Sequence, residues 1–247
     1  MSNSLSGITS SRAIFSPVLL SLLLTLGVAR LTAQTPAPTQ VPPSPTPARI
    51  VYTFDHPQLQ PSHYTITIDE TGTGRFASQP GPVSDPSDGV LPAPVDRPIQ
   101  LDDSLRAGLF HYARAHNFFQ THCTHDQSSL AFTGNKTFFY TGPDGAGSCS
   151  FVWAADPALQ SISDQLGSVA FTLEEGRRLD VEFRHDRLGL DAELASLQDA
   201  VKDRRAAGLP NIADQLHAIA ENQQVMDRAR KRALALLSRC EPPQKSN

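Results

Sequence analysis

Four residues near the middle of the chain have the types and spacing of a metal site: His116, His122, Cys123 and His125. Neutral imidazoles and a thiolate are good ligands for zinc or copper, and a zinc site needs three or four converging donors. Cys149 could supply another ligand. However, His116 lies on the apolar stripe of an expected helix, where a half-buried structural histidine is the simpler interpretation. A zinc site that uses His122 and His125, together with His116, is therefore the alternative hypothesis and not the leading one.

The cysteines offer a competing chemistry, because oxidation would remove the thiolate ligands. The chain has three, Cys123, Cys149 and Cys240, and cysteines of exported proteins are usually paired. Cys123 and Cys149 bracket a predicted hairpin and fall at strand edges, so we predict a disulfide between them. It would stabilise the fold by about 3.5 kcal/mol in the chain-entropy model, less any strain. Cys240 could then be buried, bridge to another chain or replace one partner of this pair.

Local signatures of catalysis are not found. The sequence has no Gly-x-Ser-x-Gly elbow and no His-Glu-x-x-His motif. The neighbouring pairs Glu174-Glu175 and Arg177-Arg178 are interpreted as surface ion pairs, which individually contribute little. We therefore predict no catalytic and no cofactor-binding residues and expect a protein that is not an enzyme. An enzyme with a dispersed site is left open, because chemistry does not require a local motif.

The first 33 residues have the pattern of a secretory signal. Arg12 precedes an apolar run from Ile14 to Ala29, which is shorter than the roughly 20 residues of a membrane span. Small residues follow, so cleavage after Ala33 or Ala29 is expected. The alternative is an uncleaved N-terminal anchor, which would be the protein's only membrane attachment. The mature protein is expected to be exported, either periplasmic or secreted.

Residues 34–48 form a Pro-rich spacer that has too few apolar side chains to fold. The net charge of the whole chain is -4, with both signs mixed along the sequence. No nucleic-acid partner is expected from this charge, and the basic residues near the C-terminus are interpreted as the solvated face of a helix. The expected partner is a protein or another component of the cell envelope.

Residues 49–187 combine both kinds of periodicity and predict an α+β domain. Apolar residues alternate in short runs bounded by turn residues, whereas Gln79–Pro98 is rich in proline and predicted to be a loop. A helix is expected from 103 to 119 and another from 157 to 175, capped by Asp156. Residues 177–187 could extend this second helix, which we favour, or form another strand. The expected strands lie near 50–54, 64–68, 75–78, 129–133, 136–141 and 148–153, with turns at 133–136 and 142–147.

Residues 188–247 are predicted to be a helical C-terminal region. Leucines recur at helical spacing from Leu190 to Val201, Gly208-Leu209-Pro210 interrupts the pattern, and two short helices follow. These antiparallel helices could pack on the sheet or form a small bundle.

Two segments, Tyr64–Gly72 and Leu130–Thr137, resemble segments of uncharacterised exported bacterial proteins. Those proteins also place a strand pair, a helix ending in a Phe pair (here Phe118-Phe119) and a second hairpin in this order. The similarity covers about residues 50 to 190, and its motifs are structural. It implies no activity and no site residues, and the helical tail after Leu188 lies outside it.

Together these observations predict an antiparallel sheet built from two hairpins, packed by two helices and followed by a helical region. The leading functional hypothesis is an exported, non-catalytic binding or interaction module of the bacterial cell envelope. The absence of catalytic signatures is its main support.

Overall fold

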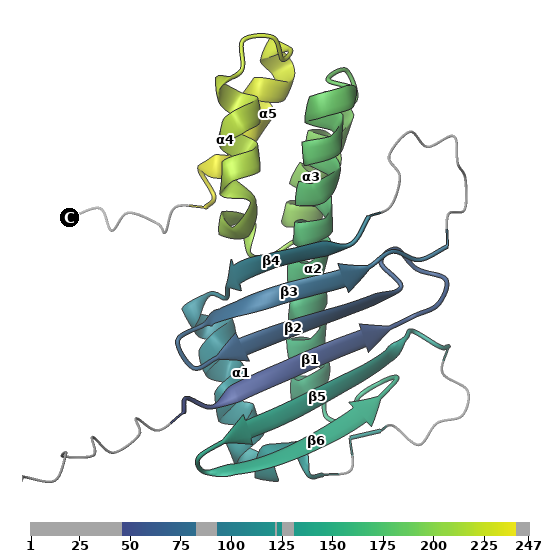
Figure 1. Ribbon diagram of the computed structural model, residues 1–247, viewed down its shortest axis with the longest axis vertical. Helices are drawn as coiled ribbons and strands as arrows, with labels where there is room; N and C mark the ends of the chain where they lie inside the picture. The colour runs from purple at the N-terminus through teal and green to yellow at the C-terminus, as the bar shows by residue number, and fades with distance from the viewer. Residues whose placement is uncertain (1–45, 83–92, 122, 125–130, 241–247) are drawn as a thin grey trace, which may run out of the picture. The chain divides into compact units, whose positions relative to one another are not determined.

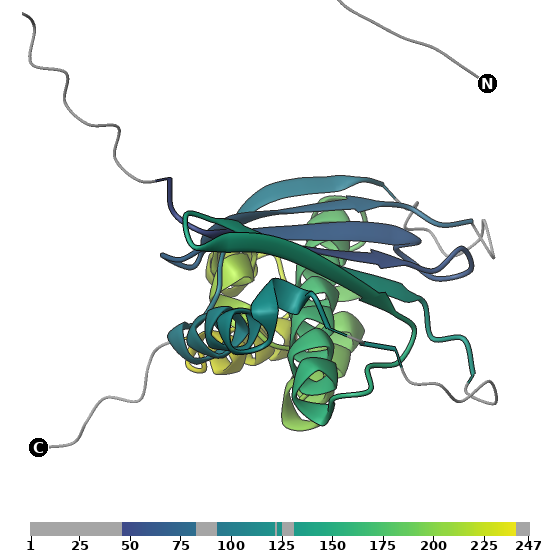
Figure 2. The same ribbon diagram turned by 90° about the horizontal axis from the view of Figure 1, so that it is seen from below.

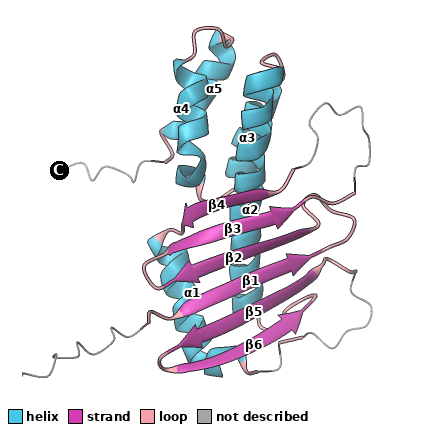
Figure 3. Cartoon of the chain, in the orientation of Figure 1, coloured by secondary structure: helices cyan, strands magenta, loops and turns pink. Residues whose placement is uncertain are grey.

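The computed structural model describes residues 46–82, 93–121, 123–124 and 131–240 and shows the predicted α+β fold (Figure 1). Six strands form one antiparallel sheet in the order β4-β3-β2-β1-β5-β6. Helices follow and flank it (Figure 3). The elements are β1 (Arg49–Asp55), β2 (His63–Asp69), β3 (Thr73–Gln79), β4 (Val95–Gln100), α1 (Asp103–Ala115), η2 (Asn117–Phe119), β5 (Asn135–Gly142), β6 (Gly145–Phe151), α2 (Pro157–His185), α3 (Leu190–Lys202), η3 (Leu209–Ile212), α4 (Ala213–Glu221) and α5 (Asp227–Leu237).

Alternating side chains give the sheet one apolar face. In β1, Ile50, Tyr52 and Phe54 are buried, while the residues between them point to the other face. Tyr52 pairs across the ladder with Ile66 of β2 and Phe138 of β5. Figure 2 shows α1 and α2 beneath this face. The register therefore places the aromatic core between the sheet and the helices.

Of the three strands predicted between residues 129 and 153, the second and third are confirmed as β5 and β6, whereas the first is not found among the described residues. Residues 131–134 are in no strand, so the strand expected at 129–133 is wrong where the structure describes it; residues 129–130 lie outside the described part. These residues form a loop in which Gly134 has a φ of +94°. The ammonium of Lys136 donates hydrogen bonds to the carbonyl of Val152 and to the hydroxyl of Thr133 in this loop. The tight turn is at Pro143-Asp144, where a longer flexible connection was predicted.

The loop predicted for 79–98 also needs correction, because β4 begins at Val95. Pro98 occurs inside this strand, opposite Arg75 of β3. A proline is tolerated there because β4 is an edge strand and needs no donor on its outer side. The sequence of β4 was predicted to be a loop because prolines interrupt its alternation of apolar and polar residues, and an edge strand tolerates such prolines.

Both helices on the apolar face begin at aspartate caps. Asp102 accepts hydrogen bonds from the backbone N–H groups of Ser104 and Leu105, at 3.1 and 2.9 Å. Asp156 accepts from the backbone N–H of Ala158 at 2.8 Å and precedes Pro157 at the first helical turn. α2 then runs to His185, which confirms the helical interpretation of residues 177–185.

The helical C-terminal region packs on the second half of α2, and its helices also pack on each other. Gly176 permits close contact there: a Cβ at this position would lie 2.4 Å from Cγ2 of Ile212. Asn211 joins this region to the sheet. Its amide accepts from the backbone N–H of Gln100 at 2.7 Å and donates to the carbonyl of Gln100 at 3.0 Å, so it stands in for a neighbouring strand. The outer edge of β4 is thereby partly covered.

The predicted disulfide between Cys123 and Cys149 is present. It fixes residues 117–121 and 123–124 along the outer edge of β6, where the amide of Gln120 and the hydroxyl of Thr124 donate to backbone carbonyls of that strand. Unpaired strand edges invite association with other chains. The disulfide therefore holds a cover on the second edge of the sheet.

Candidate functional site

The residues of the predicted metal site are not brought together in the described part of the chain. His116 stacks on Tyr112, with ring centroids 4.0 Å apart, and its Nε2 lies 4.0 Å from a carboxylate oxygen of Asp156. His122 and His125 lie outside the described residues, so the zinc hypothesis for them stays a prediction. Among the described histidines, cysteines and acids, no group of three or more could hold a metal ion.

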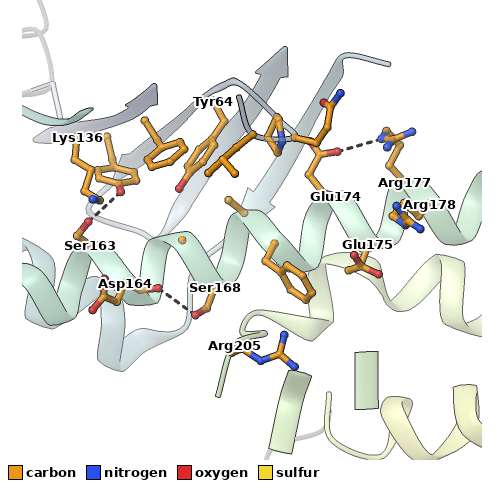
Figure 4. A pocket seen from close by; sticks show the side chains of 18 residues that line it. Tyr64, Lys136, Ser163, Asp164, Ser168, Glu174, Glu175, Arg177, Arg178 and Arg205 are labelled. Carbon is orange, nitrogen blue, oxygen red and sulfur yellow. Dashed lines mark hydrogen bonds and ion pairs between the residues drawn. The ribbon is translucent and has the colours of Figure 1, made fainter. Parts of the chain in front are cut away.

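A groove of about 480 Å³ runs along α2 at its junction with the sheet (Figure 4). This volume is in the usual range for small-molecule sites, about 300 to 1,000 Å³. Its walls come from the ends of β1, β2 and β5, the loop Leu59–Pro61 and the turn after α3. Segments far apart in the sequence thus meet in one concave surface.

Small residues of α2 make the groove possible, above all Gly167. Apart from the helix's own backbone, the one described heavy atom within 4 Å of a Cβ at this position would be the Tyr64 hydroxyl oxygen, at 3.8 Å. Glycine inside a helix costs about 0.5–1 kcal/mol relative to alanine. Packing explains Gly176 on the same helix but not Gly167. Gly167 therefore keeps space open at the groove without relieving any internal crowding.

The wall opposite α2 is aromatic. Phe54 and Tyr64 stack with ring centroids 5.0 Å apart, and the Tyr52 hydroxyl shares a 3.0 Å hydrogen bond with the Ser163 hydroxyl. Burial raises the pKa of Tyr52 to about 12 and also raises the pKa of Tyr64 well above its usual value, so both phenols stay neutral. This wall can bury an apolar body and offers hydroxyl groups beside it.

A buried lysine closes one end of the groove. The Lys136 side chain is only 7% exposed, and its ammonium donates to the carbonyl of Val152 at 2.8 Å and to the hydroxyl of Thr133 at 3.0 Å. Burial lowers its pKa, partly opposed by the field of Asp164. Because backbone and hydroxyl oxygens already take its hydrogens, Lys136 organises the groove wall and leaves little capacity for a ligand.

Charged residues of α2 line the other end. Glu174 accepts hydrogen bonds from the Ser78 hydroxyl at 2.5 Å and from Arg177 Nε at 3.1 Å. Arg178 donates to Glu193 of α3 at 2.8 Å. In contrast, no hydrogen bond or ion pair joins Glu175 to another described residue, and burial raises the pKa of its carboxyl group.

The turn after α3 supplies Arg205 to the lower rim. Arg204 has a φ of +60°, and the backbone N–H of Ala207 donates to the carbonyl of Ser168 on α2 at 3.2 Å. The Arg205 guanidinium lies 3.4 Å from the exposed carboxylate of Asp203. The turn is thus fixed to the groove floor by backbone contacts.

Sequence reasoning missed this groove. It interpreted Glu174 and Arg177 as surface ion pairs, yet Glu174 bonds to Ser78 of the sheet and its side chain is only 14% exposed. The available signal was Gly167, a glycine in an otherwise regular helical stripe. A glycine within a helix was not a sufficient signal, because Gly176 is also a glycine within α2 and its role is packing against Ile212.

No helix in the described part of the chain combines the length and apolar character needed to cross a membrane. A search of protein-family models finds no match to this chain, and a search of curated proteins finds none either.

Proposed function

We propose that this chain is an exported, non-catalytic binding module of a bacterial cell envelope, and that it holds its ligand in the groove along α2. The observation that carries this proposal is Gly167. It weakens the helix, relieves no crowding and leaves space beside an aromatic wall. Gly108 in α1 is also uncrowded but lies outside the groove, so it is the place of Gly167 in the groove, beside the aromatic wall, that supports a ligand in close contact with the helix backbone.

Two further features support the proposal. The aromatic side chains and the buried Lys136 give the groove a largely preformed wall, as ligand sites usually have. The Cys123–Cys149 disulfide is consistent with an oxidising compartment and hence with export.

The binding test uses N-phenyl-1-naphthylamine, a neutral apolar dye that fluoresces when it leaves water. The full chain should bind it saturably, and Gly167→Leu should weaken this binding by about ten-fold or more, because the leucine side chain would occupy the space that the dye needs. Gly108→Leu is the matched control, because Gly108 in α1 has open space around it and lies outside the groove. Circular dichroism checks folding, and Gly167→Ala is the milder variant. Equal binding by both leucine variants would contradict the proposal.

Export is tested separately by the intact mass of the protein recovered from an exporting host. A mass that starts at Gln34 and is two hydrogen atoms lighter than the reduced chain supports cleavage after Ala33 and one disulfide. A mass that includes the first 33 residues would contradict a cleaved signal. A stoichiometric metal adduct with reduced thiols would favour the zinc hypothesis instead.

A further inference from the structure

The sheet has a second face, which the proposed function does not use. The described helices lie beneath the other face, the one that carries the aromatic core and the groove (Figure 2). Figure 1 looks onto the second face, and no described helix covers the outward side chains of β1, β2, β5 and β6. We call the central outward residues of these four strands the open face: Val51, Thr53, Thr65, Thr67, Thr137, Phe139, Ser148 and Ser150.

The strand register arranges hydroxyl groups in a row across the open face. Thr53 of β1 lies opposite Thr65 of β2 and Thr137 of β5, and Thr137 lies opposite Ser150 of β6. Neighbouring strands are about 4.8 Å apart, so the row has a regular spacing. The Thr53 hydroxyl has no hydrogen-bond partner among the described residues, and each hydroxyl can both donate and accept. The row can therefore exchange several hydrogen bonds with one extended ligand.

An exposed aromatic ring lies beside this row. Phe139 of β5 is opposite Val51 of β1 and Ser148 of β6, and it is 46% exposed, whereas its neighbour Phe138 is fully buried. The face of an aromatic ring is weakly negative and attracts C–H groups that carry partial positive charge. Phe139 thus offers a stacking platform that is surrounded by hydroxyl groups.

The open face contains no charged residue, although it spans four strands. Strand propensity explains each threonine singly, but an exposed protein surface usually mixes charges of both signs. Outward charges occur only around the open face, and two pairs of them are joined at 2.6 Å, Asp55 with His63 and Arg75 with Asp96. The outward charged residues are Arg49, Asp55, His63, Asp69, Arg75 and Asp96.

This chemistry excludes several kinds of partner. A polyanion or a polycation would find no opposite charge at the centre of the open face. A second copy of the chain would need a largely apolar centre, and only Val51 and Phe139 are apolar there. Hydroxyl groups around one aromatic ring instead match a partner that is uncharged, rich in hydroxyls and flat.

We propose that the open face binds a linear, uncharged glycan with equatorial linkages, such as β-1,4-linked N-acetylglucosamine. Such a chain is an extended ribbon whose rings carry C–H groups on their faces and polar groups along their edges. One ring stacks on Phe139, and the polar edges exchange hydrogen bonds with the row from Thr65 to Ser150. The length of one ring in such a ribbon is close to the spacing of the strands, so successive sugars meet successive strands.

The test is isothermal titration calorimetry of the full chain with chitohexaose, which should bind saturably. Phe139→Ala should weaken binding by about ten-fold or more, as the loss of a central aromatic anchor does, and Phe139→Trp should retain it. Phe132→Ala is the matched control, because Phe132 is 50% exposed but lies in the loop before β5 and outside the open face. Circular dichroism checks the folding of each variant.

Two further comparisons test the hydroxyl row and the shape of the ligand. Thr53→Val with Thr65→Val removes two hydroxyls but keeps β-branched side chains that suit a strand, and it should weaken binding by about three- to ten-fold. Maltohexaose is also uncharged, but its axial linkages give a curved chain in place of a ribbon. It should bind much more weakly than chitohexaose.

The outcomes are distinct from those of the groove. Absence of chitohexaose binding, equal binding of maltohexaose, tighter binding of the polyanion heparin, or equal losses in Phe139→Ala and Phe132→Ala would each overturn the glycan assignment. A dimer in light scattering that Phe139→Asp disperses would also overturn it, because a second copy would then occupy the open face. Phe139→Ala should bind N-phenyl-1-naphthylamine as wild type does, since the groove lies on the other face, so either proposal can fail while the other stands.

Discussion

Gly167 and Gly176 both lie in α2, yet one is uncrowded and the other is tightly packed. A Cβ at Gly176 would lie 2.4 Å from Ile212, whereas a Cβ at Gly167 would meet only the Tyr64 hydroxyl at 3.8 Å. Around Gly176, α2 is therefore closed against the helical C-terminal region, and around Gly167 it keeps unfilled space against the sheet. We call these the closed half and the open half, although the groove lining continues from the open half as far as Arg178.

This difference shows that one helix can be tightly packed at one glycine and uncrowded at another. The C-terminal region packs tightly on α2 at Gly176 and ties itself to β4 through Asn211. The sheet side is held together by a disulfide and an aromatic layer. Substitutions at each half should therefore change different properties.

The largest effect is expected from removing the disulfide on the sheet side. Cys123→Ser with Cys149→Ser should lower the free energy of unfolding by about 3.5 kcal/mol in the chain-entropy model, since the pair is 26 residues apart. The cover on the β6 edge would be released as well, so we also expect self-association. Urea denaturation and light scattering measure the two effects. An unchanged unfolding midpoint would show that the disulfide does not hold the sheet side together.

Gly176→Leu tests the closed half of α2. Overpacking against Ile212 should cost about 3 kcal/mol, because this interface has no room for a side chain. Gly108→Leu adds the same side chain where no neighbour lies within 4 Å and should not destabilise the protein. Urea denaturation compares the two variants. If they prove equally stable, the contrast between the halves of α2 is not real.

Gly167→Ala tests the open half and should have the opposite sign. Replacing a helical glycine that is not crowded should stabilise the protein by about 0.5–1 kcal/mol. Binding of the dye should nevertheless decrease. Thermal denaturation and a dye titration on the same sample measure both changes, and a loss of stability would mean that the groove is filled more tightly than the structure shows.

The smallest effect concerns the pH dependence that Glu175 contributes. Its folded pKa is raised by burial, so the native state binds this proton more readily than the unfolded chain does. The group therefore adds stability below its unfolded pKa of about 4.5, and this stability is lost as the pH rises through the folded pKa. Relative to wild type, Glu175→Gln should gain stability at pH 7 compared with pH 4. The same pH profile for Glu221→Gln serves as control, and parallel curves for all three proteins would refute the raised pKa.

Local patterns were sufficient for much of the fold. Alternation at Ile50, Tyr52 and Phe54 predicted a strand because the sheet buries one face, and Asp156-Pro157 predicted the start of α2 because capping is a local interaction. Prediction failed where a long-range contact decided the conformation. Pro98 is in a strand because β4 lies at the edge, and residues 131–134 are not in a strand because they wrap Lys136.

By itself the sequence determined the fold class and the helix starts, since each depends on periodicity or capping. It favoured the pairing of Cys123 with Cys149, but only the tertiary structure decided between this pair and one that uses Cys240. The candidate site was decided only by tertiary structure. Gly167, Glu175 and Tyr64 come from α2 and β2, and nothing in their local sequence distinguishes them from ordinary packing or surface residues. A groove exists only where separate elements meet and leave space, and the volume left between elements is not encoded at any single position.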